Sequence, residues 1–273
     1  MKLRSSIFIA ASAIVALEAP ALAQTFGPRD GPRWESPQHF AIELRIGSFS
    51  ENIDGQLGLA GRGPYNEIFC STRDPNAPAN APVGCPFRFR GGLEFDWQIL
   101  RLGPVGSLGV GAIATYGNAT ARAPATAGMS STDPTTWRRS AQDTSLQVLQ
   151  SSIHAVLRVD VLARRIRWLP LAPYAKAGIA LAPWWVTSGE MNARDPVTGQ
   201  DAVGLSHGFF LAGGLAVMLD TFEPDVARQW DQVSGVNHSY LFFELHYTYL
   251  GGFTRRTLDV GGLAWTAGVT IEF

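Results

Sequence analysis

The sequence predicts an all-β fold: a closed antiparallel barrel of eight transmembrane strands with a short periplasmic helix. Three observations predict it. Apolar and polar residues alternate with a period of two in eight segments, long and short connections alternate between those segments, and the chain begins with an export signal. Only 16% of the 273 residues are charged and the formal net charge is -1, so nothing in the composition favours nucleic-acid binding.

An export signal occupies the N-terminus. Two basic residues precede an apolar stretch over 7–17, and the small-residue motif ALA follows at 21–23. The apolar stretch is too short for a stop-transfer helix, so we expect cleavage after Ala23 rather than an uncleaved membrane anchor. The predicted organisation is a signal peptide over 1–23, a periplasmic segment over 24–37 and a barrel over 38–273.

Eight segments alternate between apolar and polar or small residues, as half-buried strands do. In residues 87–101, Leu93, Phe95 and Trp97 fall on one face, whereas Glu94 and Asp96 fall on the other. A tilted strand needs roughly 9–11 residues to cross a hydrocarbon core, and each segment has about that length or more. In chain order, strands are expected within 39–48, 87–101, 107–117, 149–162, 173–185, 205–220, 240–250 and 263–273.

The connections also alternate in length, which is typical of outer-membrane barrels. The first, third and fifth, near 49–86, 118–143 and 187–204, are long, whereas the second and fourth are short. The sixth should be short but is not: Pro224 followed by Asp225 is typical of a helix start, and Val226, Trp230 and Val233 are spaced by four and three residues. We interpret it as a periplasmic helix that covers one mouth of the barrel, with an extended loop as the alternative. Ten strands are the alternative to eight if part of the first connection pairs with its neighbours.

The polar faces carry many ionic residues, and this decides which face points outward. Burying unpaired ions in a soluble core would cost several kcal/mol each, and apolar walls in water would exceed the patch that a monomer tolerates. A lipid-facing apolar wall around a polar lumen avoids both costs, and closure satisfies every backbone group in the bilayer. Eight strands leave room only for side chains, so we expect a filled lumen. The expected lumen charge network comprises Glu43, Arg45, Arg88, Arg90, Glu94, Asp96, Arg158, Asp160, Lys176 and Glu244.

Two cysteines, Cys70 and Cys85, flank a segment rich in proline, asparagine and alanine. Because exported proteins meet oxidising conditions, we expect a disulfide between them. By chain entropy, closing a loop of that length contributes roughly 3 kcal/mol. A disulfide inside the first connection indicates an exposed loop that the cross-link stabilises. Metal binding by two cysteines without a nearby histidine is a poor alternative.

The chain ends on the apolar strand LAWTAGVTIEF, with Phe273 as its last residue. In this it resembles the small outer-membrane β-barrels of Gram-negative bacteria, whose C-terminal phenylalanine is read by the barrel-assembly machinery. The resemblance implies that Val269, Ile271 and Phe273 form the C-terminal assembly signal. More narrowly, the stretches ELRIGSFSENID, GPYNEIF, GLEFDWQILRLGPVGSLGVG and GVNHSYLFFELHYTYLGGF resemble a group of myxobacterial outer-membrane barrels. That resemblance covers most of the mature chain and implies no assigned chemistry.

The predicted function is that of an integral outer-membrane protein with a structural or surface-interaction role through long extracellular loops. A narrow channel is one alternative. A lipid-modifying enzyme is another, because Ser152, His154, Glu244 and His246 share the lumen face, as nucleophilic catalysis requires. We predict no catalytic residue, metal site or cofactor. The expected partners are outer-membrane lipids and the barrel-assembly machinery, and the protein is expected to be a monomer in the outer membrane.

Overall fold

A computed structural model describes residues 39–49, 51–57, 63–70, 86–102, 105–123, 140–165, 169–194 and 198–273. The predicted signal peptide and periplasmic segment, residues 1–37, lie outside this part of the chain, and so does Cys85. The cleavage site and the disulfide therefore stay predictions.

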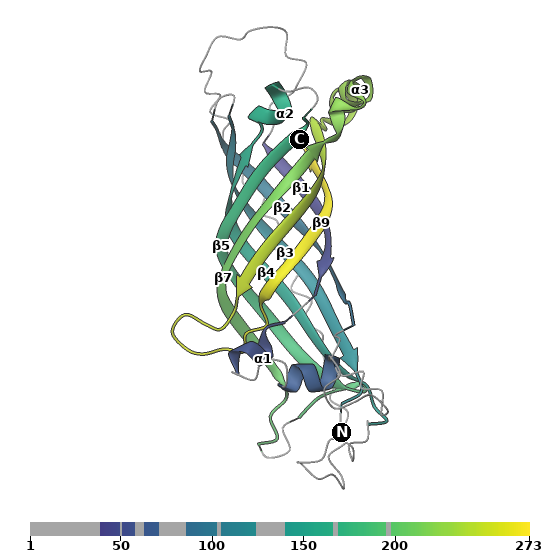
Figure 1. The fold of residues 1–273 in the computed structure, drawn as a ribbon, viewed down its shortest axis with the longest axis vertical. Coiled ribbons are helices and arrows are strands. Elements are labelled where there is room, and N and C mark those ends of the chain that lie inside the picture. Colours follow the sequence, from purple (N-terminus) through teal and green to yellow (C-terminus); the bar gives the residue numbers. More distant parts are fainter. Residues whose placement is uncertain are drawn as a thin grey trace, which may run out of the picture. The chain divides into compact units, whose positions relative to one another are not determined.

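The strands form one closed antiparallel barrel (Figure 1). The sheet has nine strands, but β6 (Met191–Asn192) is only a two-residue extension in the connection after β5, so eight strands build the wall. The pairing of β1 with β9 and of β4 with β5 closes the sheet, which confirms the predicted architecture. The eight wall strands are β1 (Phe40–Ser48), β2 (Phe89–Arg101), β3 (Gly106–Ala121), β4 (Thr144–Val159), β5 (Leu171–Ser188), β7 (Val203–Met218), β8 (His238–Tyr249) and β9 (Gly262–Glu272).

The strands present apolar residues outward and mostly polar residues inward, as the alternation predicts. On β1, Leu44 has 59% of its surface exposed, whereas its neighbours Glu43 and Arg45 have 0% and 2%. Ile153 on β4 is 60% exposed, and the adjacent His154 is buried. Because successive strand residues point to opposite faces, one register fixes the sidedness of a whole strand.

The last strand closes the barrel down to the final residue. The backbone N–H of Phe273 donates to the carbonyl of Phe40 at 2.9 Å, and the N–H of Phe40 donates to the carbonyl of Phe273 at 2.9 Å. This exchange satisfies backbone groups that a free edge would leave unpaired. The apolar ending of the sequence is therefore part of the closing seam between β1 and β9.

The first connection folds into two short helices, and within its described residues it adds no strand to the sheet. They are α1 (Ile53–Gln56) and the π-helix η1 (Asn66–Cys70). The barrel thus has eight wall strands and not ten. We call the end that carries the connections β1–β2, β3–β4, β5–β7 and β8–β9 the loop end of the barrel.

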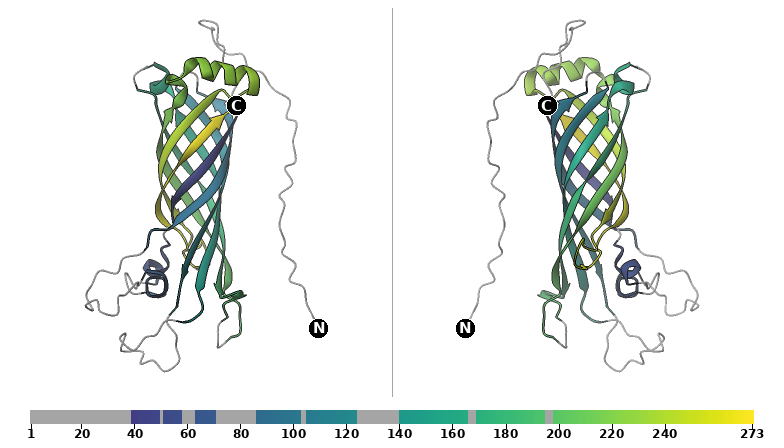
Figure 2. Two further views of the ribbon diagram at one scale, coloured as in Figure 1. Left: turned by 90° about the vertical axis from the view of Figure 1, so that its right-hand side faces the viewer. Right: turned by 90° about the vertical axis from the view of Figure 1, so that its left-hand side faces the viewer.

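The opposite end carries α2 (Val161–Arg165), the short 3-10 helix η3 (Leu219–Thr221) and α3 (Pro224–Ser234), and we call it the helix end (Figure 2). Helix α3 confirms the helix predicted in the sixth connection. Its first residue is Pro224, and Gly235 ends it in the left-handed conformation with φ 71°. Its apolar side chains, including Val226 and Trp230, are exposed and do not fill the barrel mouth. Among the described residues, no helix is long and apolar enough to span a bilayer.

Candidate functional site

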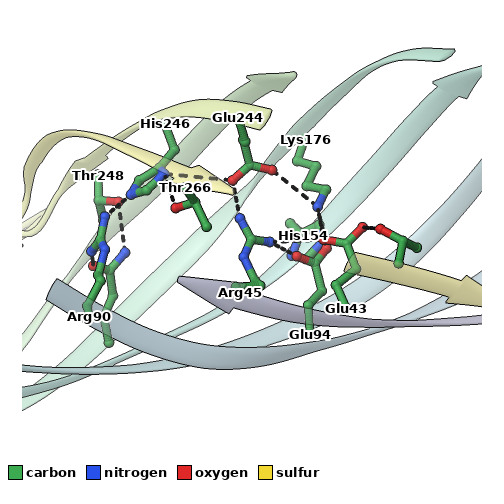
Figure 3. A network of polar contacts seen from close by, with 12 residues as sticks. Glu43, Arg45, Arg90, Glu94, His154, Lys176, Glu244, His246, Thr248 and Thr266 are labelled. Carbon is green, nitrogen blue, oxygen red and sulfur yellow. Dashed lines mark hydrogen bonds and ion pairs between the residues drawn. The ribbon is translucent and has the colours of Figure 1, made fainter. Parts of the chain in front are cut away.

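The middle of the lumen holds a group of interlocked ions centred on Lys176 (Figure 3). The ammonium of Lys176 lies 3.0 Å from Glu43 Oε2, 2.7 Å from Glu94 Oε1 and 3.2 Å from Glu244 Oε2. Arg45 contacts the same three carboxylates from β1. All five side chains are almost completely shielded from solvent. Two cations thus share three anions contributed by β1, β2 and β8.

A second set of contacts extends this group toward the helix end. Arg158 on β4 pairs with Glu43 at 3.3 Å and with Glu272 on β9. The Glu272 carboxylate also accepts hydrogen bonds from Gln98 Nε2 at 2.7 Å and from the Tyr240 hydroxyl at 3.2 Å. We call the ions of both sets the ionic belt, which consists of Glu43, Arg45, Glu94, Arg158, Lys176, Glu244 and Glu272.

Aromatic rings line the belt and face its cations. The Lys176 ammonium lies 4.8 Å from the centroid of the Tyr174 ring. The guanidinium carbons of Arg158 and Arg45 lie 5.4 Å from the ring centroids of Tyr240 and Phe242, respectively. Because a desolvated cation is attracted to the negative face of a ring, these contacts offset part of the cost of burying the charges.

A cluster of Glu94, Asp96 and His154 lies beside the belt. His154 Nε2 is 3.0 Å from Glu94 Oε1 and 3.3 Å from Asp96 Oδ1. Gly111 makes this approach possible, because it lies between Asp96 and His154 in the sheet register and a Cβ there would collide with Asp96 Oδ1 and lie 2.6 Å from His154 Nε2. Because Gly111 has no side chain, side chains of β2 and β4 can meet across β3.

The same cluster has the residue types of a metal site, since its three ligand atoms lie within 4.8 Å of one another. The charges around it fit a cation poorly. Glu94 Oε1 already contacts the Lys176 ammonium at 2.7 Å, and Glu94 also pairs with Arg45. A divalent ion bound to Glu94 would lie close to both fixed cations and be repelled by them. The arrangement suits His154 as a hydrogen-bond donor to Glu94, beside the carboxylate of Asp96, better than as a metal ligand.

A third polar layer lies on the loop side of the belt. Arg90 donates from Nη1 to Gln150 Oε1 at 2.8 Å and contacts the ring of His246 through Nη2. His246 Nδ1 lies 3.2 Å from the Thr266 hydroxyl and 3.7 Å from Glu244 Oε1. Through His246 and Glu244, this layer adjoins the belt (Figure 3).

The structure brings most of the ten residues of the expected charge network together, but not all of them. Six belong to the ionic belt, Asp96 joins through His154, and Arg90 joins through His246. Arg88 lies nearer the loop end, where it donates to the carbonyl of Phe69 and has its guanidinium carbon 5.9 Å from that ring's centroid. Asp160 is buried where β4 ends. Glu272 is a belt residue that the expected network omits, although it has the inward parity on β9.

Apolar clusters close the lumen on both sides of the belt, which the alternation did not predict. At the loop end, Phe49, Ile53 and Phe69 of the first connection pack against inward side chains such as Leu146 and Phe210. At the helix end, inward residues of β5, β7 and β8 pack with Ala163 of α2. We call these clusters the loop plug and the helix plug. The helix plug consists of Ala163, Ala172, Tyr174, Ala216, Met218, Tyr240 and Phe242.

The loop plug shows that other parts of the first connection are buried, whereas the exposure expected of the segment between the two cysteines stays a prediction. Cys70 and Ile53 are buried, and Asp54 accepts hydrogen bonds from the backbone N–H groups of Tyr65 at 2.9 Å and Asn66 at 2.7 Å. Parts of this connection therefore fold into the barrel mouth, because their apolar side chains have an apolar lumen surface to cover. The segment between Cys70 and Cys85 lies outside the described residues.

The first connection is also tied to the last one. Gln56 donates from Nε2 to the carbonyl of Thr257 at 2.7 Å and accepts from the N–H of Asp259 at 2.8 Å. Nearby, burial raises the pKa of Glu51 to about 8 against the attraction of Arg90, and Asp259 raises it further. We call residues 51–57, 63–70 and 250–261 together the loop platform. Long-range hydrogen bonds join its segments.

The chain is similar to several proteins of known structure. No protein-family model matches this sequence, and no curated protein matches it. The solved structures include Ail, the attachment invasion locus protein of Yersinia pestis, crystallised with the heparin analogue sucrose octasulfate. It is 10% identical, with 86% of this chain and 97% of that chain covered and a TM-score of 0.37.

Two further structures are similar to a comparable extent. Neisserial surface protein A is 13% identical, with 86% of this chain and 97% of that chain covered and a TM-score of 0.40. The outer membrane protein OprG of Pseudomonas aeruginosa is 10% identical, with coverages of 88% and 97% and a TM-score of 0.43. None of these comparisons tests the narrower resemblance to myxobacterial barrels, which stays a prediction. The description of this chain as a closed barrel rests on its own strand pairing.

Proposed function

We propose that this chain is an integral outer-membrane protein in which a filled, non-conducting barrel holds the loop platform at the cell surface for a surface-interaction role. The observation that supports this most is the contrast between the two faces of the wall. Exposed large apolar residues recur on all eight wall strands, as Leu44, Leu93, Val110, Ile153, Ile179, Leu211, Leu245 and Leu263 illustrate. In water, the protein would aggregate through this apolar surface, whereas the hydrocarbon core of a bilayer is a favourable environment for it.

A structural or binding role fits the lumen better than transport does. Three successive levels of the described lumen are filled by side chains: the loop plug, the ionic belt and the helix plug. An ion that crosses the belt would have to separate Lys176 from three carboxylates at 2.7–3.2 Å. Eight-stranded barrels also have interiors that side chains can fill completely.

Catalysis is disfavoured by the contacts of the residues that could perform it. The hydroxyl of Ser152 is buried and has no hydrogen-bond partner among the described residues, so none of these residues activates it as a base. His154 is directed at Glu94 and Asp96, and His246 at Arg90 and Thr266. All three side chains also lie beneath plugs, where a lipid substrate would have no path to them.

The loop platform is the surface that an extracellular partner would meet. It unites the first and last connections of the barrel, which are far apart in sequence, through the hydrogen bonds of Gln56. Asp54 in α1 accepts hydrogen bonds from the backbone N–H groups of Tyr65 and Asn66, which join α1 to the start of η1. An ordered platform loses less conformational entropy on binding than free loops would.

Three measurements test the proposed function. Fractionation should recover the protein in the outer membrane with a mobility on electrophoresis that changes on boiling, and a soluble protein without that change would refute membrane insertion. Planar bilayers with the purified barrel should show no discrete conductance steps, and reproducible steps would favour the channel.

The surface role is tested with living cells. Bacteria that express the Asp54→Ala variant should form fewer sedimenting aggregates than bacteria that express the wild type. They should also adhere less to polystyrene. Asp143→Ala, which removes an exposed pair with Arg122 near the same end, serves as the matched control. Equal aggregation and adhesion of all three strains, at equal surface amounts, would leave only the structural role.

A further inference from the structure

Helix α3 presents an apolar stripe that the described structure leaves uncovered. Phe222, just before the helix, is 66% exposed, Trp230 is 52% exposed and Val233 is 88% exposed. With Val226, these residues are spaced by four, four and three positions, so they share one face of the helix. Asp225 and Gln232 are exposed and lie roughly 100–120° around the helix axis from Val226, outside the apolar stripe.

The position of the helix relates this stripe to the membrane boundary. Figures 1 and 2 together show α3 at the helix end, beside the rim of the barrel, with its axis running across the barrel axis. A helix in that orientation lies parallel to the plane of a bilayer that surrounds the barrel. Amphipathic helices at membrane surfaces take this orientation, with the apolar face buried at the boundary between headgroups and acyl chains.

A groove of about 240 Å³ lies between the apolar stripe and the barrel wall. Phe222, Val226 and Trp230 form its helix side, and Leu219 of η3 and Ser239, which has an outward-facing position on β8, form the other side. From Ser239, the same outward row continues along β8 through the exposed residues Leu241 and Phe243. The groove is therefore continuous with the apolar surface that faces lipid in the proposed function.

Hydrogen bonds just before the first residue of α3 fix the position of the helix beside the groove. Asp220 in η3 accepts hydrogen bonds from the N–H of Ser239 at 3.2 Å and from its hydroxyl at 3.1 Å, and it pairs with the ring of His238. Met218 N–H donates to the carbonyl of Pro170, which fixes the end of β7 just before η3. These contacts attach the start of the connection to β8 and β5, so that α3 is held against the rim.

We propose that α3 is an interfacial helix whose groove takes up phospholipid acyl chains of the periplasmic leaflet of the outer membrane. The helix contains two aspartates and one arginine, and its last turn contains no basic residue. Attraction to anionic headgroups therefore contributes little, and apolar burial supplies the affinity. Trp230 has the amphipathic ring that is enriched at membrane–water boundaries. A zwitterionic phospholipid satisfies this chemistry. The inference depends on the membrane insertion and the orientation of the proposed function.

Spin labels on single cysteine substitutions test the inference in phospholipid nanodiscs that contain one barrel each. The informative sites are Val233→Cys and Val226→Cys on the stripe, and the matched control is Gln232→Cys on the polar face. Ile153→Cys, in the middle of the outward wall of β4, reports on the barrel itself. Wild-type protein treated with the same label gives the background of the native cysteines.

Oxygen collects in lipid and a nickel chelate stays in water, so the ratio of the two accessibilities measures immersion. The ratio should be several-fold higher at the Val226 and Val233 sites than at Gln232, and unchanged when anionic lipid is added or salt is raised. Equal ratios at Val233 and Gln232, with a lipid-like ratio at Ile153, would overturn the interfacial helix and leave the proposed membrane barrel intact. A water-like ratio at Ile153 would overturn the membrane barrel instead. Labels at Val226 and Val233 that neither reagent reaches would show that protein covers the stripe, which also contradicts the inference.

Discussion

Replacement of Lys176 by methionine is the most direct test of how the lumen stabilises the barrel. Methionine keeps most of the side-chain length but removes the ammonium that lies 3.0, 2.7 and 3.2 Å from Glu43, Glu94 and Glu244. Those carboxylates would then face one another with less compensation in a site shielded from solvent. Removing one partner from a buried ion pair costs about 3–5 kcal/mol. We expect Lys176→Met to lower the free energy of unfolding by an amount in that range.

The assay is urea-induced unfolding of barrels refolded in detergent micelles, followed by tryptophan fluorescence and by the loss of the heat-sensitive mobility. Arg194→Met is the matched control, because Arg194 pairs at 2.6 Å with Asp201 at an exposed site and such pairs contribute about 0–1 kcal/mol. Adding Glu244→Gln to Lys176→Met removes one excess negative charge and should recover part of the loss. If Lys176→Met destabilises no more than Arg194→Met does, the belt does not hold the barrel together and the reasoning fails.

Three further predictions concern other parts of the molecule. Gly111→Ala should lower the free energy of unfolding by about 1–3 kcal/mol through overpacking, because the new methyl group would collide with Asp96. Glu51→Gln should stabilise the loop platform above neutral pH, because the folded pKa of about 8 exceeds the ordinary value of 4.5. The ionised form is therefore disfavoured in the fold, and stability falls as pH rises between those values. Phe273→Ala should reduce the amount of barrel in the outer membrane of cells while purified protein still refolds in detergent, because its backbone bonds to Phe40 remain.

Each of these predictions has its own control or contradicting result. Gly213→Ala is matched to Gly111→Ala, since nothing lies within 4 Å of a Cβ at Gly213, and equal urea midpoints for the two variants would contradict the packing argument. For Glu51, limited proteolysis of the wild-type platform should accelerate as pH rises from 5 to 9, and Glu51→Gln should remove most of that pH dependence. An identical pH profile in both proteins would contradict the assignment. For Phe273, wild-type levels of Phe273→Ala barrel in cells would mean that the residue is no assembly signal.

The wall of the barrel could be predicted from the sequence because its information is local. The alternation in β2, where Leu93 and Phe95 flank Glu94, is sufficient to define both the strand and its sidedness. The helix α3 was also predictable, since Pro224 and the spacing of Val226 and Trp230 are local signals. Strand ends were less predictable: β3 continues to Ala121, within the region that the sequence assigns to the third connection, and β4 begins at Thr144, before the expected segment 149–162.

The plugs could not be predicted from the same signal. Phe242 and Tyr240 have the inward parity on β8, but their outward neighbours Leu241 and Phe243 are apolar too, so the alternation is lost there. Which ions pair across the lumen depends on the register of strands that are distant in sequence. The burial of Ile53 in the mouth depends likewise on a lumen surface that exists only after closure.

If the protein is inserted in the membrane as proposed, the ionic belt also has a consequence for how it enters. Its seven side chains come from β1, β2, β4, β5, β8 and β9, so their partners meet only when nearly the whole chain has come together. A single hairpin inserted in advance would leave an ammonium or a carboxylate in contact with hydrocarbon, which is costly. Stepwise entry of hairpins is therefore opposed, and the strands must gather before or during their passage into the bilayer. Neutralisation of the interior charges would then coincide with completion of the cylinder and favour an all-or-none assembly.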